Sequence, residues 1–152
     1  MSKSKINFNV LVKLIDKYRT DAEICLEAGA YFAGLVSVRA ALESMLLSRF
    51  LLELYEWEPE ELNKYEITMQ EDLIEVARKD IPNLKTLIQE AFKAKLIGIT
   101  GYQAAERIRI WGNKIHASRI ASKDKLPNIN SRNLKARIKD LDLVANQLLR
   151  SL

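Results

Sequence analysis

Residues 109–116 (RIWGNKIH) combine side chains that could act on a phosphodiester, and they include the only histidine of the chain. An arginine is always charged at neutral pH, whereas an imidazole gains and loses its proton there. In a helix, a turn of about 100° per residue would place Arg109 and His116 on one face, with Asn113 between them. This spacing predicts a helix face with a cation, an amide and a proton-transferring group. The competing interpretation is a solvated polar face with a structural histidine.

The cysteine and histidine content limits the metal chemistry that one chain could support. The sequence has one cysteine and one histidine. A zinc or iron–sulfur site built by a single chain needs several such ligands, and an internal disulfide needs two cysteines. Cys25 lies in an apolar helical pattern, which favours a packing role. We therefore expect no metal, no cofactor and a reducing, cytoplasmic environment.

No leader or membrane segment is expected from the sequence. The basic start, residues 1–5, runs into a mixed polar segment without a sustained apolar region. The longest apolar tracts are interrupted by Arg39, Glu43 and Arg49, and none reaches the roughly 20 residues that span a bilayer. These features favour a cytoplasmic protein with no membrane partner.

The net charge of +4 hides a strong asymmetry along the chain. Residues 53–90 contain 11 acidic and 4 basic side chains, whereas residues 107–152 contain 11 basic and 3 acidic ones. A basic block attracts phosphate backbones, and the candidate nucleic-acid contacts closest to His116 are Arg107, Lys114 and Arg119. The alternative is that the basic block pairs with the acidic block, within one chain or across a dimer.

The apolar periodicity is helical almost throughout, and no segment alternates as a strand does. We expect an N-terminal helical extension within residues 1–19. The Thr20–Glu23 capping box should then open a short helix that ends at Gly29. The later helices are expected at 30–55, 68–79, 84–95, 101–118 and from Asn130 or Ser131 onward, with an acidic connector at 56–67 and a loop at 121–130.

This pattern predicts a single domain over residues 1–152. Its fold class is all-α, an antiparallel bundle of five or six helices with short loops.

Two charges fall within the wide apolar band of the 30–55 helix. Arg39 and Glu43 are four residues apart and can pair on one helix face. If they are buried and tied to the polar face of the 101–118 helix, Arg39→Ala would cost about 3 kcal/mol or more, because it strands Glu43. An ordinary exposed pair would cost about 1 kcal/mol or less.

The ordered set of motifs resembles the HEPN superfamily (higher eukaryote and prokaryote nucleotide-binding domains), in particular a bacterial branch of it with no assigned function. The likeness covers about residues 20–120. It rests on three segments in order: 22–31 (AEICLEAGAY) running into 38–43 (VRAALE), 84–88 (LKTLI) leading to 96–98 (LIG), and 109–116 (RIWGNKIH).

The resemblance implies a domain with two long central helices that dimerises through them. It also implies an Arg-x(4–6)-His motif, here Arg109 and His116, at a cleft near the dimer interface. Active members cleave RNA there without a metal. The chain departs from the pattern at Ile110, where many active nucleases have a polar residue, often Asn.

Three functions are compatible with these residues. In a metal-independent endoribonuclease, His116 would transfer protons, Arg109 would neutralise the phosphorane and Asn113 would orient the histidine or the phosphate. One histidine cannot easily act as acid and base at once, so a homodimer would supply a second His116 for the other role. The second function is a non-catalytic RNA- or nucleotide-binding module of a defence or toxin–antitoxin type system, with a protein partner encoded nearby. The third is a purely structural dimer.

A homodimer is also expected from the apolar circumference of the 30–55 helix, which exceeds what a small bundle needs. The surplus side chains that we expect at the interface are Tyr31, Phe32, Phe50 and Leu54.

Overall fold

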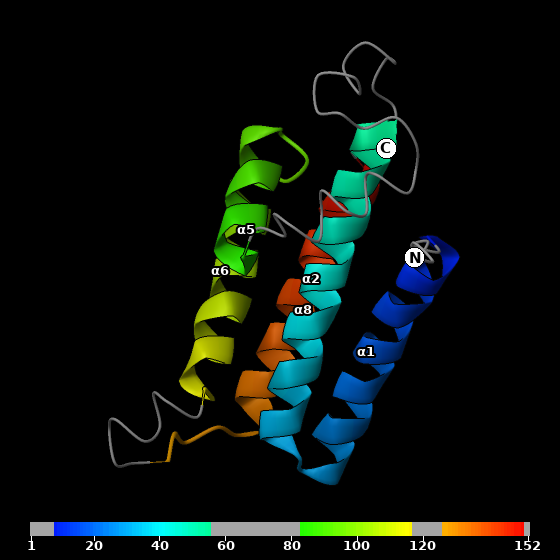
Figure 1. The fold of residues 1–152 in the computed structure, drawn as a ribbon. Helices are drawn as coiled ribbons and strands as arrows, with labels where there is room; N and C mark the ends of the chain where they lie inside the picture. The colour runs from blue at the N-terminus through cyan, green and yellow to red at the C-terminus, as the bar shows by residue number, and fades with distance from the viewer. Residues whose placement is uncertain (1–7, 56–82, 117–125, 151–152) are drawn as a thin grey trace, which may run out of the picture.

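The computed structural model describes residues 8–55, 83–116 and 126–150, and these ranges contain helices but no strand. Figure 1 shows the arrangement. The five helices are α1 (Phe8–Ala28), α2 (Tyr31–Tyr55), α5 (Leu84–Lys93), α6 (Ile99–Lys114) and α8 (Ser131–Arg150). The predicted all-α class is therefore confirmed over the described residues. The expected connector at 56–67 and helix at 68–79 lie outside them.

Helix α2 is the centre of the bundle, because α1, α5, α6 and α8 all pack against it. Its partners lie around it, with α1 on one side and α5 and α6 on the other (Figure 1). The apolar residues of α2 that are almost fully buried include Val38, Ala41 and Leu42. Complete burial of a leucine or isoleucine contributes roughly 1.5–3 kcal/mol, so this row is a main source of stability. The largest fully buried residues elsewhere are Ile88, Ile97, Ile108, Leu134, Leu141 and Val144.

A glycine turn joins α1 to α2 as an antiparallel hairpin. Gly29 has φ of +76°, a left-handed conformation that lacks a steric penalty only for glycine. The backbone N–H of Ala30 donates to the carbonyl of Cys25 at 2.8 Å, which closes the last turn of α1. The predicted helix end at Gly29 is confirmed.

Two predicted helix starts are wrong. The Thr20–Glu23 box does not open a helix, since α1 runs unbroken from Phe8 to Ala28. No Gly or Pro interrupts this stretch, and Arg19 instead pairs with Glu23 one turn later. Helix α6 begins at Ile99, with Gly98 as its N-cap. The Thr100 hydroxyl does not cap it, because it accepts a hydrogen bond from Gln147 Nε2 on α8 at 2.7 Å.

The last helix begins where the sequence predicted. Asn130 and Asn133 cap it reciprocally, each side-chain oxygen accepting from the other's backbone N–H at 3.0 Å. The apolar positions at helical spacing face the core: Leu134, Ile138, Leu141 and Leu148 are buried, and Ala145 is half-buried. Residues 126–130 precede the helix without regular structure, as expected for the end of a loop.

One described stretch, Tyr31–Arg49 of α2, is long and apolar enough by composition to cross a membrane. This differs from the expectation that no such run exists. Half of the stretch is buried inside the bundle, and core helices commonly meet the same criterion. It also contains Arg39 and Glu43, so it is weak evidence for a membrane span.

Helices α1, α2 and α8 approach closely at Gly34. A Cβ built there would overlap Leu134 Cδ2, and it would lie 3.0 Å from Leu134 Cδ1 and 3.2 Å from Cys25 Cβ. The absence of a side chain at this position therefore sets how near α8 can pack to the α1–α2 hairpin.

We predict that Gly34→Ala destabilises the fold by about 1–3 kcal/mol, because the added methyl overpacks this crossing. Urea unfolding followed by circular dichroism measures the change. In a Leu134→Ala background the methyl has room, so the cost of the double variant should fall clearly below the sum of the single costs. Additive costs would show that the added methyl does not clash with Leu134.

Candidate nucleic-acid interface at the end of α6

Helix α6 ends earlier than the sequence predicted, and this moves His116 off the helix. The last helical residue is Lys114, and Ile115 is the C-cap with φ −95° and ψ 3°. The chain then tightens, since the N–H of His116 donates to the carbonyl of Asn113, three residues back, at 3.2 Å. The predicted single helix face for Arg109 and His116 is therefore wrong at His116. The histidine lies exposed just beyond the helix end.

Arg109 is held by a neighbour on its own helix. Its Nε and Nη2 donate to the two carboxylate oxygens of Glu106, at 3.0 and 2.6 Å. This hydrogen-bonded pairing raises the pKa of the Arg109 guanidinium, although partial burial opposes the rise. A guanidinium has five N–H donors, so three remain beside the two that Glu106 accepts. About a fifth of the side chain is exposed, so the guanidinium is oriented by Glu106 and is still accessible to solvent.

Asn113 is engaged with α2. Its Oδ1 accepts from Arg39 Nη1 at 3.2 Å, and Arg39 Nε lies 3.5 Å from Glu43 Oε1. The expected link between the Arg39–Glu43 pair and the polar face of α6 is thus present. Gly112 permits it, because a Cβ there would lie 3.0 Å from Arg39 Cδ. Glu43 is 48% exposed, so the expected cost of about 3 kcal/mol for Arg39→Ala is too high: water still reaches the carboxylate.

Arg107 belongs to a triad that joins α6 to α8. Its Nε and Nη2 donate to the Asp140 carboxylate, the shortest contact being 2.8 Å. Arg137 Nε donates to the same carboxylate at 2.8 Å. Asp140 and Arg137 are buried, whereas Arg107 is nearly half exposed. Two guanidiniums share one carboxylate, and the triad keeps a net positive charge at the surface beside Arg107.

Lys114 lies over the indole of Trp111, with its Nζ 3.8 Å from the ring centroid. Arg137 approaches the same ring, its Cζ 5.3 Å from the centroid. Both distances allow cation–π attraction. The half-buried indole therefore holds Lys114 at the helix end, near His116.

Arg107, Arg109 and Arg137 each pair with a carboxylate that is three residues away on the same helix or on a packed helix. Glu106 and Asp140 were not among the predicted functional residues, although the i,i+3 spacing of Glu106 and Arg109 is visible in the sequence. Asp140 is found only once α8 is packed on α6. Arg119 and most of the acidic block lie outside the described residues. Within the described ranges, no three His, Cys, Asp or Glu side chains form a metal-binding group.

Comparisons of this chain with protein-family models, with curated proteins and with solved structures found no match.

We predict that Asp140→Asn destabilises the fold by about 3 kcal/mol or more, because it leaves the buried Arg137 without a counter-charge. Asp142→Asn is the matched control. Asp142 pairs with Arg19 on α1 at 2.8 Å, and both side chains are over a third exposed, so its loss should cost about 1 kcal/mol or less. If chemical unfolding shows that both variants lose the same free energy of unfolding, the triad does not hold α6 against α8 more strongly than an exposed ion pair would.

Proposed function

We propose that this protein is an RNA-binding domain of the HEPN type, and that the C-terminal half of α6 contacts the RNA. The observation that carries the proposal is Arg109, a guanidinium oriented by Glu106 with three N–H donors left for a phosphate. An oriented fork suits a phosphodiester because it can donate to two of its oxygens at once. The resemblance to HEPN domains includes this arginine.

Two further cations support the same assignment. Arg107 uses two of its donors on Asp140 and is nearly half exposed, so it too retains N–H groups for a ligand. Lys114 is held at the helix end over Trp111. Helix C-termini favour cations, so Lys114 is well placed on the dipole while its charge faces solvent. All three cations lie on the C-terminal half of α6, the part of the helix that precedes His116.

Metal-independent cleavage of the bound RNA is a second candidate function, and the exposed position of His116 favours it. An accessible imidazole can act as base on the 2′-hydroxyl or as acid on the leaving oxygen. Binding ranks first because Asn113 is bonded to Arg39, so the amide predicted to orient the histidine has another partner. A single histidine also lacks a complementary acid unless a second copy provides one.

Cleavage would need a homodimer, which we propose as part of this second function. Among the residues expected at its interface, Tyr31 packs against the core, whereas Phe32 is 37% exposed and Val36, one turn on, is 56% exposed. The side chains of Phe50 and Leu54 lie outside the described set. An exposed apolar pair on the central helix favours a second copy as its cover.

The binding proposal is tested with two variants that differ only at Arg109. In Glu106→Gln the arginine keeps its charge, and the amide oxygen can still accept a hydrogen bond from it. The negative charge beside the proposed phosphate site is lost, so affinity for a labelled oligouridine strand should hold or rise. In E106Q/R109Q both charges are absent, which avoids a stranded carboxylate, and affinity should fall by roughly tenfold, as for a lost charged hydrogen bond. Fluorescence anisotropy gives both values. Equal affinity in the two variants would remove Arg109 from the interface.

Cleavage is tested on the same strand with gel separation of the products. If the protein cuts RNA, His116→Ala should abolish cleavage, EDTA should have no effect, and the products should end in a 2′,3′-cyclic phosphate. The variant should unfold at the wild-type temperature, because His116 is exposed. Cleavage that survives His116→Ala would contradict the mechanism, whereas tight binding without cleavage assigns the non-catalytic module.

A further inference from the structure

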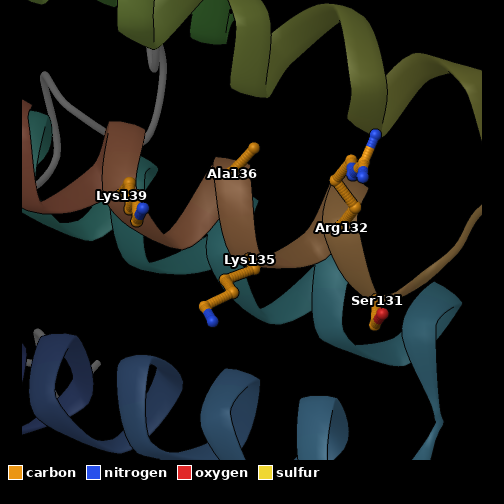
Figure 2. Close-up of a pocket in the computed structure, with 5 residues that line it drawn as sticks. All are labelled: Ser131, Arg132, Lys135, Ala136 and Lys139. Carbon is orange, nitrogen blue, oxygen red and sulfur yellow. The ribbon is translucent and has the colours of Figure 1, made fainter.

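The outward face of α8 carries a row of cations, Arg132, Lys135 and Lys139, which we call the α8 stripe. With Ser131 and Ala136 these residues line a shallow, open hollow of about 340 Å³. The small side chain of Ala136 lies between the longer ones and leaves the hollow. Figure 2 shows Arg132 on the side of α6 and Lys135 on the side of α1. All three cations are exposed, and no ion pair joins them to another described residue.

The acidic residues of α8 do not neutralise the stripe. Helix α8 contains only two of them, and both point to neighbouring helices. Asp140 is bonded to Arg107 and Arg137, and Asp142 is bonded to Arg19 on α1. Asp140 is buried, and Asp142, although 43% exposed, is neutralised by Arg19. The three cations of the stripe therefore keep a net positive charge on the outer face. A surface of one sign attracts a polyanion over a distance of about 10 Å at moderate salt.

We propose that the α8 stripe binds the phosphate backbone of the same RNA strand that contacts α6, an inference that rests on the proposed function. Helix α6 ends and α8 begins at the same end of the bundle (Figure 1), and Arg132, the first cation of the stripe, lies on the side of α6 (Figure 2). A rise of 1.5 Å per residue extends the stripe about 10 Å along α8. The three cations can therefore contact successive phosphates of a strand that runs from α6 along α8.

The neighbouring surface favours a nucleic acid over a membrane. A helix that lies on a bilayer inserts a broad apolar face between its cationic residues. The apolar face of α8 is instead buried in the core through residues such as Leu134, Ile138 and Leu141. Among the described residues, the only apolar side chain in the hollow between these cations is that of Ala136, which is too small to insert into a bilayer. Recognition here is by charge along a line, as for a phosphate backbone.

The test compares two triple variants with the same change in net charge. R132Q/K135Q/K139Q removes the stripe, and K13Q/K85Q/K93Q removes three exposed lysines on α1 and α5. Binding of a labelled oligouridine strand is measured by anisotropy from about 50 to 200 mM salt, with unfolding curves to establish that each variant is folded. Three lost phosphate contacts should reduce the slope of log affinity against log salt by about 2. At low salt the stripe variant should bind about tenfold more weakly, and the control should bind as the wild type does.

Each other outcome overturns the inference. Equal losses in both triple variants would show an effect of net charge alone. Unchanged RNA binding in the stripe variant, with weaker binding in E106Q/R109Q, would leave the α6 function standing and remove the stripe from it. A wild-type chain that does not bind the strand overturns both proposals. If phosphatidylserine vesicles bind the wild type and not the stripe variant while RNA binding is unchanged, the stripe is a lipid-headgroup surface.

Discussion

The carboxylate of Asp140 is the contact on which the relation between α6 and α8 depends. It accepts hydrogen bonds from Arg107 on α6 and from Arg137 on its own helix, in a site that excludes most water. A charge buried in this way is tolerated only when its partners are well oriented, and both arginines meet that condition. Because the candidate interface lies on α6 and the cation stripe lies on α8, this carboxylate helps to determine how the two surfaces lie relative to each other.

The polar residues of α6 form several separate contacts rather than one preassembled catalytic group. Glu106 orients Arg109, Arg39 occupies Asn113, and His116 follows the end of the helix. An arginine fixed by a carboxylate loses less conformational freedom when it meets a phosphate, which favours binding. Proton transfer needs a second positioned group near the imidazole. Such a group can come from another copy of the chain. Binding therefore needs only the oriented cations, whereas cleavage also needs a second proton-transferring group beside His116.

The surface charge of α8 depends on which of its charged side chains the packing pairs with neighbouring helices. Asp140 and Asp142 face neighbouring helices and meet arginines there, while Arg132, Lys135 and Lys139 face solvent. A helix of mixed composition thereby acquires an outer face of one sign. The same principle applies on α6, where Glu106 is three-quarters or more covered and Lys114 is exposed. Net charge alone would not have distinguished these faces.

The sequence by itself determined the helical class, the apolar band of α2, the glycine turn after α1 and the cap at Asn130, because each depends on local periodicity or local hydrogen bonding. It also identified Arg39 and the 109–116 segment as the polar features of the chain. Only the tertiary structure decided that α1 is continuous, that α6 stops before His116, and which carboxylate each arginine meets. Competing local signals, such as the Thr20–Glu23 box, are resolved by packing, which favours an unbroken buried face. Partners such as Arg107 and Asp140 are 33 residues apart, and no local pattern relates them.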